Sequence, residues 1–403
     1  MNRLMSWLDA RFPLVSTWKQ YFGNYYVPKN LNFFYFFGSL ALVILVNQVF
    51  TGLWLTMFYT PSAEAAFSSI EYIMRDINYG WLLRYMHSTG ASAFFIVIYL
   101  HMFRGLLYGS YQRPRELVWV LGMFLYVVLL AAAFFGYLLP WGQMSYWGAE
   151  VITSLFGTIP YIGKSLVVWL RGDYSVTTVT LQRFFALHVI AIPLLLVFLV
   201  FLHIVALHHV GSNNPEGIEI KNTLDEQGKP LDGIPFHPYY VVKDFVGVIV
   251  FLILFFAVVF FMPEMRGYFL EHSNFTPANP LVTPDHIAPM WYMSPFYAML
   301  RAIPDQLAGI VCMGMAIAVL FFLPWLDRST VRSMRYKGMP SRVMLFIAVT
   351  AFLLLGYLGT IPVSPVRLLI ARAATISYFA YFLLMPFYTR FETVGVLPAR
   401  IGK

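Results

Sequence analysis

The chain has 403 residues, of which 59% are hydrophobic and 11% are charged, and its mean hydropathy is +0.68. A soluble domain carries about 25% charged residues, so this composition excludes an ordinary soluble protein and indicates an integral membrane protein. The formal net charge of +8 is assigned to anchoring at lipid headgroups, and no nucleic-acid partner is expected.

Eight apolar runs are long enough to cross about 30 Å of hydrocarbon. They lie at 34–56, 79–103, 116–138, 184–206, 244–262, 307–326, 342–361 and 367–387. An even number of spans places both termini on one side. Of the 27 lysine and arginine residues, 18 fall on that side, which predicts cytoplasmic termini. The first 30 residues are mixed and polar, so no cleavable signal peptide is expected, and a bacterial inner membrane is predicted.

The sequence predicts an all-α membrane protein in two halves. Residues 1–210 form a four-helix bundle, 211–243 form a polar connection on the inner side, and 244–403 supply the last four helices. The outer segments 139–172 and 263–306 are too apolar for solvated loops. We expect them to fold as short helices against the bundle, where binding sites tend to form.

Four histidines occur as pairs within two of the spans. His87 and His101 are 14 residues apart in the second span, and His188 and His203 are 15 apart in the fourth. Fourteen residues make almost four helical turns, so His87 and His101 share a face and lie about 21 Å apart along the axis. Imidazoles are costly in lipid unless partnered, and haem iron is the partner that two facing pairs would suit.

Glycines repeat the same spacing in two other spans. Gly38 and Gly52 are 14 residues apart in the first span, as are Gly122 and Gly136 in the third. Because glycine has no side chain, a flat ring can approach the backbone closely at each of these positions. Packing glycines are common in membrane helices, but four with the histidine spacing favour two stacked haems.

The second histidine pair overshoots four turns by about 60°. Pro193 lies between its members and is expected to bend or locally unwind the helix, which would absorb the extra residue. We assign His87 and His188 as axial ligands of an outer haem, and His101 and His203 as ligands of an inner haem.

Anionic haem propionates require cations, and three arginines lie near the histidines in sequence. Arg84 and Arg183 precede the outer ligands, and Arg104 follows the inner ligand His101. Interfacial arginine that reaches the headgroups is the alternative. The single cysteine, Cys312, lies within an apolar span, and there is no Cys-x-x-Cys-His motif, so both b haems are expected to be non-covalent.

Two other functions stay open at this point. A non-redox transporter could use an intramembrane histidine relay, but that function does not explain the glycine spacing. A dihaem membrane anchor of a quinone-linked dehydrogenase also uses paired histidines, but such anchors usually have four or five spans. A visible spectrum of the purified protein separates the transporter from both haem proteins.

Several motifs resemble cytochrome b of the quinol–cytochrome c oxidoreductase, or bc complex, over about residues 20–388. They are Arg84-Tyr-Met-His87, Leu139-Pro-Trp-Gly-Gln-Met-Ser145, Trp147-Gly-Ala149, Arg183-Phe-Phe-Ala-Leu-His188, Gly211-Ser-Asn-Asn-Pro215, Phe236-His-Pro-Tyr-Tyr240, Pro289-Met-Trp-Tyr292 and Leu300-Arg-Ala-Ile-Pro304. Related photosynthetic complexes normally carry the two halves on separate chains, whereas this chain keeps them together. The 15-residue histidine spacing leaves the subfamily open.

The resemblance implies a proton-translocating electron-transfer subunit with two b haems and two quinone pockets. An outer pocket would oxidise quinol and send one electron to an iron–sulfur partner. The other electron would pass through both haems to reduce quinone at an inner pocket. The implied partners are a Rieske iron–sulfur protein and a cytochrome c1-type subunit, in a homodimer of the complex.

The outer pocket implied by the resemblance is formed by 142–155 and 286–301. Gly142, Gly148 and Ala149 would leave room for the quinone ring. Bordering residues would be Tyr137, Met290, Tyr292 and Tyr297. The inner pocket would draw on His208, Ser212, Lys243 and Asp244, with His208 and Asp244 at the quinone carbonyls.

One position departs from the family pattern. The usual loop motif is Pro-Glu-Trp-Tyr, whose carboxylate is assigned to accept a quinol proton, whereas position 290 is methionine here. Glu150 stands in the facing motif. We therefore hypothesise that Glu150 accepts the proton, since desolvation would raise its pKa into a useful range. The alternative is that Glu150 faces water or a partner subunit.

Overall fold

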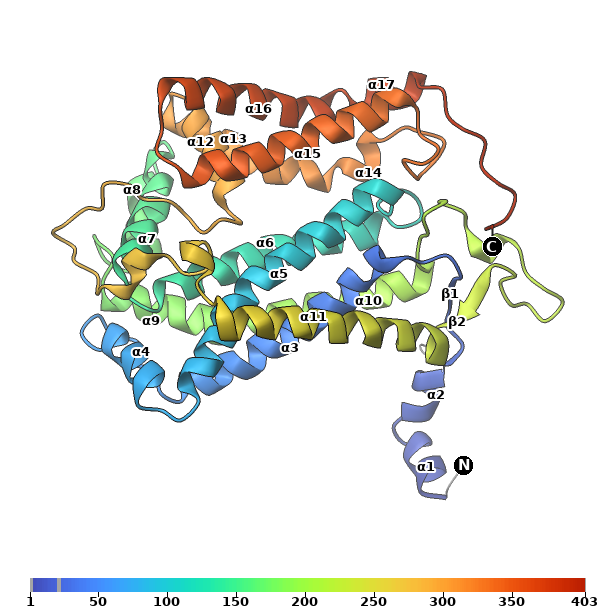
Figure 1. Ribbon diagram of the computed structural model, residues 1–403, viewed down its shortest axis with the longest axis horizontal. Coiled ribbons are helices and arrows are strands. Elements are labelled where there is room, and N and C mark those ends of the chain that lie inside the picture. Colours follow the sequence, from blue (N-terminus) through green and yellow to red (C-terminus); the bar gives the residue numbers. More distant parts are fainter. Residues whose placement is uncertain (1–2, 20–22, 403) are drawn as a thin grey trace.

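The computed structural model describes residues 3–19 and 23–402 (Figure 1). The regular secondary structure of this part of the chain is helical apart from one small antiparallel sheet, so the all-α membrane fold is confirmed. The helices are α1 (Arg3–Asp9), α2 (Leu14–Trp18), α3 (Phe36–Thr56), α4 (Ala66–Arg75), α5 (Gly80–Tyr108), α6 (Glu116–Leu138), α7 (Gln143–Leu155), α8 (Gly163–Arg171), α9 (Thr178–Ala186), α10 (Ile192–Val210), α11 (Val241–Phe261), α12 (Ser294–Ala302), α13 (Gln306–Phe321), α14 (Leu323–Leu326), α15 (Met339–Thr360), α16 (Pro365–Leu383) and α17 (Met385–Phe391). The strands are β1 (Tyr26–Pro28) and β2 (Gly233–Pro235).

Seven helical segments of the described chain are long and apolar enough to cross a membrane. They are Phe33–Thr56, Gly80–Tyr108, Glu116–Leu138, Thr178–Val210, Phe236–Phe261, Met339–Thr360 and Pro365–Leu383. The remaining predicted span forms as α13, whose 16 residues rise only about 24 Å. The count of eight spans therefore stays a prediction. In Figure 1, α12 lies at the upper left and α14 to the right of the centre, and α13 runs between them.

The sixth predicted span is interrupted by Pro324. This proline has no N–H to donate to the Leu320 carbonyl, so α13 ends at Phe321 and the short α14 follows. The indole of Trp119, on α6, donates to the Leu320 carbonyl instead, at 2.7 Å. The carbonyl left without a helical partner at the break thus forms a hydrogen bond between the two halves of the chain.

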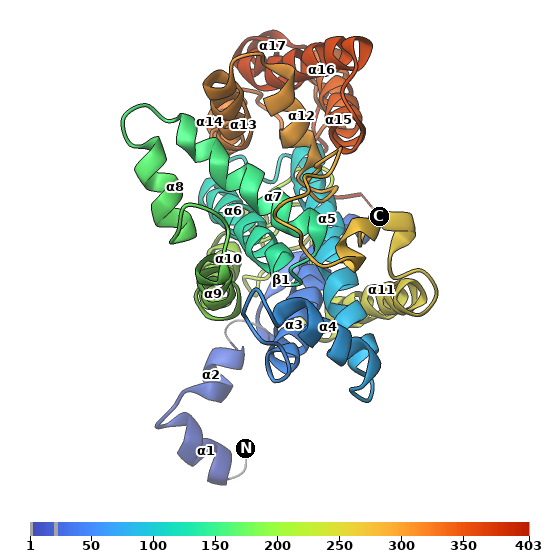
Figure 2. The ribbon, with the colours of Figure 1, turned by 90° about the vertical axis from the view of Figure 1, so that its left-hand side faces the viewer.

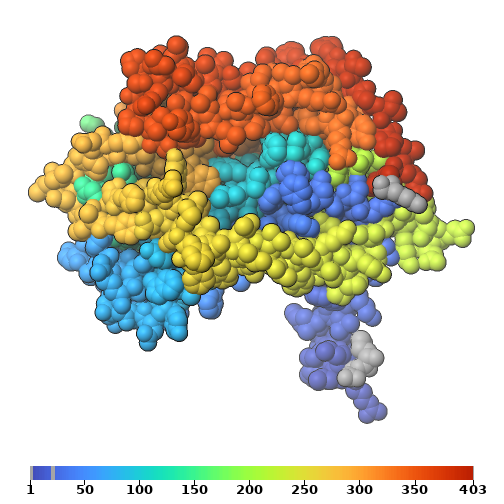
Figure 3. Space-filling model, in the orientation of Figure 1, coloured from blue at the N-terminus to red at the C-terminus, as the bar shows by residue number. Residues whose placement is uncertain are grey.

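The helices form two packed groups. Contacts join α3 with α5 and α6 with α10, and α12, α13, α15 and α16 pack together as a separate layer. Figure 2 shows this second layer on one side of the first group, and Figure 3 shows α11 along the face of the first group.

The helix α11 packs with the first group, against α3 and α5, although it follows the predicted domain boundary at 211–243. Gly247 allows the close approach, since a Cβ there would lie 2.8 Å from the ring of Phe36. The Ser39 hydroxyl also donates to Asp244 at 2.8 Å. By packing, the second group therefore begins at α12.

The polar connection and both termini lie toward one end of the molecule, at the right of Figure 1. There β1 pairs with β2, and Asp232 binds Lys29 at 3.0 Å and Arg400 at 3.1 Å. The opposite end carries α4, α7 and α8. The short helices expected in 139–172 and 263–306 are present as α7, α8 and α12.

A buried carboxylate connects the two groups. Asp327, after α14, pairs with Lys337, and both side chains are almost completely buried. The same carboxylate accepts hydrogen bonds from Tyr111 at 2.6 Å and Gln112 at 2.7 Å. Both of these donors lie between α5 and α6, so one carboxylate connects the first half to the second.

Candidate haem and quinone sites

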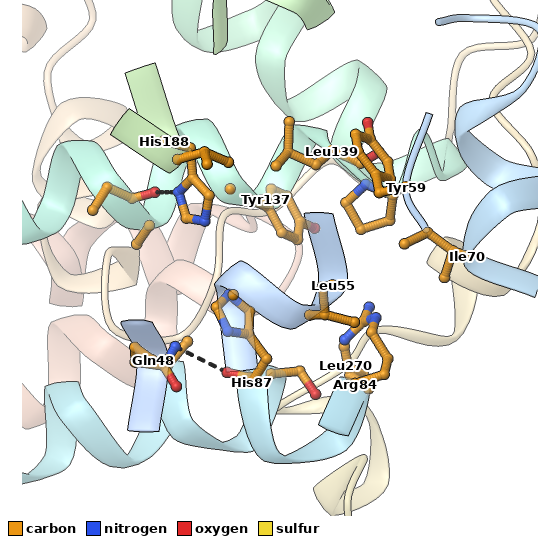
Figure 4. Close-up of a pocket in the computed structure, with 18 of the residues that line it drawn as sticks. Gln48, Leu55, Tyr59, Ile70, Arg84, His87, Tyr137, Leu139, His188 and Leu270 are labelled. Atoms are coloured by element: carbon orange, nitrogen blue, oxygen red, sulfur yellow. Dashed lines mark hydrogen bonds between the residues drawn. The ribbon is translucent and has the colours of Figure 1, made fainter. Parts of the chain in front are cut away.

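The outer histidines face each other across a cavity. His87 lies on α5, and His188 lies on a π-helical turn, Leu187–Ala191, between α9 and α10. Their ring centres are 6.1 Å apart and the ring planes are inclined at 84° (Figure 4). Because the two rings lie on different segments of the chain, they face each other only when the helices of the bundle are packed together.

Hydrogen bonds fix one nitrogen of each outer imidazole. His188 Nδ1 lies 2.9 Å from the Ala132 carbonyl, and His87 Nδ1 lies 2.9 Å from the Thr51 hydroxyl. Thr51 donates its proton to the Asn47 carbonyl at 2.6 Å, so its oxygen accepts from His87. Both Nδ1 atoms are therefore protonated, which leaves Nε2 as the metal-binding nitrogen of each ring.

Thr51→Val is expected to raise the potential of a haem held by His87 and His188 by about 20–60 mV. Loss of one hydrogen bond, worth about 0.5–1.5 kcal/mol, makes the His87 imidazole a weaker donor, which destabilises oxidised iron. A redox titration of the α-band in the purified complex measures the shift. Thr51→Ser, which keeps the hydroxyl, should restore the original potential. A Val variant with an unchanged outer potential would show that this hydrogen bond does not tune the ligand.

The inner histidines form a second facing pair. His101 lies on α5 and His203 on α10, with ring centres 6.4 Å apart and planes inclined at 61°. The Arg104 guanidinium lies beside them, with Nη2 3.3 Å from His101 Nδ1. Its Nε is buried and has no hydrogen-bond partner among the described residues, so a donor at this site is available to an anionic group.

Both separations fit a metal held between two imidazoles. A metal–imidazole bond is about 2.0–2.1 Å long and the ring centre lies about 1 Å behind the nitrogen, so two axial imidazoles have centres about 6–6.5 Å apart. The observed values are 6.1 and 6.4 Å. The predicted pairing of first with first and second with second is the arrangement in the structure.

Each of the four repeated glycines faces one of the four histidines. A Cβ atom would lie 3.4 Å from the nearest atom of His101 at Gly38, and 3.1 Å from His87 at Gly52. The corresponding distances are 3.3 Å from His203 at Gly122 and 2.4 Å from His188 at Gly136. The sequence argument expected a haem edge at these glycines. The structure shows that the imidazoles themselves need this space, because helices with larger residues here would push the rings away.

The extra residue between His188 and His203 is absorbed by the π-helical turn at Leu187–Ala191. Pro193 follows directly and has no N–H to donate to the Val189 carbonyl, so the regular bonding of the helix is interrupted here. The predicted local unwinding is therefore present. It lies at the ligand itself, on the N-terminal side of the proline.

The three arginines differ in their contacts. Arg84 lines the outer cavity together with His87, and Arg104 lies beside the inner pair. Arg183 is exposed, donates to the Trp169 carbonyl at 2.6 Å and packs against Gly172. The structure therefore does not support a propionate contact for Arg183. Five residues along a helix turn the side chain about 140° away from His188.

The outer cavity has a volume of about 520 Å³ and extends past the histidines toward the 263–306 segment. Its walls include Tyr137, Met290 and Tyr292, as predicted for the outer pocket, and also Phe275 and Asn274. Tyr292 stacks on Phe95 with ring centres 3.8 Å apart, which holds the loop before α12 against α5. The space beside the outer pair is thus a mostly apolar chamber with few polar groups, typical of a ligand site.

Other residues predicted for the outer pocket lie behind this wall. Gly148 packs against the Tyr137 ring, Ala149 is buried in an apolar cluster with Leu138, and the Tyr297 hydroxyl donates to the Ile287 carbonyl at 3.1 Å. Gly142 faces Asn274, where a Cβ would lie 2.6 Å from Oδ1. These small residues admit neighbouring protein groups, and none of the four lines the cavity.

Glu150 makes contacts that do not fit the hypothesised proton acceptor. Its carboxylate pairs with the buried Arg171 at 2.6 Å and accepts from the Val176 backbone N–H at 2.7 Å. It is not among the residues that line the cavity. The pair instead connects α7 to the end of α8.

Sequence analysis missed a different carboxylate. Glu271, in the loop after α11, accepts hydrogen bonds from the Tyr137 hydroxyl at 2.7 Å and from Asn274 at 2.9 Å. Burial raises its pKa to about 7. No local motif marks this residue, because its environment is made by α6, which lies more than a hundred positions earlier in the chain.

The residues predicted for the inner pocket form two groups. His208 stacks on Tyr25 with ring centres 4.4 Å apart, and the Tyr25 hydroxyl lies 3.2 Å from Ser212 Oγ. Asp244 belongs to the other group, bound to Ser39, and Lys243 is exposed. Tyr25, which sequence analysis did not select, joins His208 to Ser212.

The chain matches known proteins over most of its length. Residues 22–211 match the family model described as cytochrome b/b6/petB, and 277–379 match cytochrome b(C-terminal)/b6/petD. A "Cytochrome b" of Allochromatium vinosum is 59% identical over 98% of each chain, and one of Rickettsia prowazekii is 51% identical over 98% of this chain and 97% of its own.

A solved structure and a longer relative extend this likeness. The structure is titled "Hyperthermophilic respiratory Complex III", with a TM-score of 0.88, 40% identity and coverage of 96% of this chain and 99% of its own. A "Cytochrome b/c1" of Bradyrhizobium diazoefficiens is 47% identical over all of this chain and 57% of its own length. With two facing histidine pairs and identities well above 30% over whole chains, the protein belongs to the cytochrome b family.

Proposed function

We propose that this cytochrome b holds two b haems and carries electrons between two quinone sites in a quinol–cytochrome c oxidoreductase. The proposal rests on the two facing histidine pairs. In each pair one histidine lies on α5 and the other lies on α10 or on the π-helical turn before it, and a glycine lies beside each ring. When bound, haem iron supplies one-electron redox chemistry.

The protein's contribution is to hold and orient these ligands. His87 and His188 would bind the outer iron through Nε2, since Thr51 and the Ala132 carbonyl occupy Nδ1. His101 and His203 would bind the inner iron. Arg84 and Arg104 supply cationic groups for propionates, and the apolar chamber walls exclude water.

Quinol oxidation is assigned to the outer chamber next to His87 and His188. Its walls include Tyr137, Met290 and Tyr292. One electron would go to an iron–sulfur protein and the other across the chain toward the inner pair. Quinone reduction is assigned to the inner end, where His208, Ser212 and Asp244 offer hydrogen-bonding groups.

The complex III title of the structural relative and the "Cytochrome b/c1" name of the longer relative support partners of two kinds. We assign these to a Rieske iron–sulfur protein and a cytochrome c1-type subunit, in a homodimer. The excess of lysine and arginine on the side of the termini supports an orientation with both termini in the cytoplasm of a bacterial inner membrane.

A redox titration of the α-band, combined with pyridine haemochrome quantification, tests the proposal. We expect two one-electron components and two b haems per chain, both reduced by added quinol. A colourless protein would favour the transporter function. Two haems that quinol reduces without any transfer to cytochrome c would favour the dihaem anchor.

A further inference from the structure

Three side chains form a hydrogen-bonded group on the wall of the outer chamber. Tyr137 and Asn274 both line the chamber, and both donate to Oε2 of Glu271, at 2.7 and 2.9 Å. Tyr137 comes from α6, whereas the other two residues belong to the loop after α11. The carboxylate thus lies directly behind two polar groups that face the chamber.

The orientation of each hydrogen bond in this group is determined by its neighbours. Asn274 Oδ1 accepts from the Ser145 backbone N–H at 2.8 Å, so its amide nitrogen points to Tyr137 and Glu271. Tyr137 has one proton, which it donates to Glu271. Its oxygen accepts from Asn274 and retains one further acceptor position, which suits a hydroxyl group in the chamber.

From this geometry, and resting on the proposed quinol oxidation, we infer that Glu271 accepts a proton from quinol through the hydroxyl of Tyr137. As the quinol O–H bond breaks, its proton passes to the Tyr137 oxygen and the Tyr137 proton passes to Glu271. The tyrosine ends unchanged, the carboxylate becomes a carboxylic acid, and the one electron released with this proton leaves to one of the acceptors named above.

The surroundings of Glu271 allow it to change its protonation state. The groups that face it are Tyr137 from α6, Tyr292 from the loop before α12, and Asn274 from its own loop. None of the ion pairs found in the described chain involves Glu271, in contrast to Glu150, which is paired with Arg171. The next residue, His272, is 75% exposed and lies 3.9 Å from Glu264, so the carboxylate is close to the outer surface.

The expected pH dependence follows from the raised pKa. Burial raises the pKa of Glu271 to about 7, with the hydrogen bonds from Tyr137 and Asn274 acting in the opposite direction. Below this pH the group is already protonated and cannot accept a second proton. Quinol oxidation should therefore accelerate as the pH rises through about 7.

The experiment compares Glu271→Gln with Glu271→Asp in the purified complex, measuring quinol-driven reduction of the haems and steady-state turnover at several pH values. Glutamine still accepts the Tyr137 hydrogen bond but cannot take a proton. We expect it to slow both rates by about 10- to 100-fold and to abolish the acceleration near pH 7. Aspartate should restore part of the rate together with the pH dependence.

Two matched carboxylates serve as comparisons. Glu264→Gln, in the same loop, and Glu150→Gln, the residue first suggested by the sequence, should both keep the pH dependence. Tyr137→Phe should lose it while Glu271 remains in place. Haem spectra of every variant report whether the outer site is intact.

Each outcome decides the inference. A Glu271→Gln variant that keeps the wild-type rate and pH dependence would overturn it. So would a variant that is slow at every pH but still accelerates near 7, since that pattern indicates a structural role. If the unmodified complex is not reduced by quinol at all, the proposed function fails instead.

Discussion

Gly136→Ala should remove the haem proposed between His87 and His188 and abolish quinol turnover, while the haem proposed between His101 and His203 remains. The added Cβ would lie 2.4 Å from Cε1 and 2.8 Å from Nδ1 of His188, closer than side-chain carbons approach one another. The ring cannot simply move away, because its Nδ1 is bound to the Ala132 carbonyl one turn earlier on α6. We expect haem content to fall by about half and turnover to fall by more than about 100-fold, since losing a metal ligand is among the largest single-residue effects.

Two other glycines provide controls of graded severity. At Gly38 the added Cβ would lie 3.4 Å from His101, an ordinary contact, and at Gly314 no atom lies within 4 Å. Gly314→Ala should keep full haem content and turnover, and Gly38→Ala should lower haem content much less than Gly136→Ala. Pyridine haemochrome analysis and the α-band spectrum give the comparison. Normal outer haem in Gly136→Ala would mean that the His188 ring does not occupy the position described here.

Lys337→Met should destabilise the folded chain by about 3–5 kcal/mol, because it leaves the Asp327 carboxylate buried without its cation. Both members of this pair are almost inaccessible to solvent, with side-chain exposures of 1% and 0%. Tyr111 and Gln112 would still donate to Asp327, but neutral donors do not compensate a buried charge. Since these contacts join the two helical groups, we expect loss of the C-terminal packing first.

Thermal unfolding of the detergent-solubilised complex measures this effect. Replacing both residues, as in Asp327→Asn with Lys337→Met, should recover part of the stability, because no unpaired charge remains. Glu71→Gln removes an exposed pair with Arg75 on α4 and should change the free energy of unfolding by less than about 1 kcal/mol. Equal melting temperatures for Lys337→Met and the unmodified complex would show that the ion pair does not stabilise the assembly.

Sequence periodicity predicted the two facing histidine pairs because the relevant information is local to each helix. His87 and His101 share a face of α5 by spacing alone, and the glycines repeat that spacing on neighbouring helices. Pro193 also predicted a distortion of the helix near the second pair, and the structure has a π-helical turn there. In each case a few neighbouring residues determine the geometry.

The chamber wall depends on contacts between distant segments, which periodicity does not report. Glu271 receives its proton donor from Tyr137, and nothing in the sequence around 271 indicates a helix 134 positions earlier. Glu150 is the reverse case. Its motif suggested a proton acceptor, but in the folded chain its carboxylate pairs with Arg171. The structure gives no support to Arg183 as a haem contact, since its distance from His188 in sequence places it on another face of the helix and its guanidinium donates to the Trp169 carbonyl.

Because of the π-helical turn at His188, the number of residues between two histidines of one helix does not give their distance along the helix axis. The turn takes up one surplus residue, and the imidazoles of the longer helix still come level with those of α5. An insertion or deletion at this point can therefore be absorbed without shifting either histidine pair. The number of positions between paired histidines is then a poor guide to electron-transfer distance.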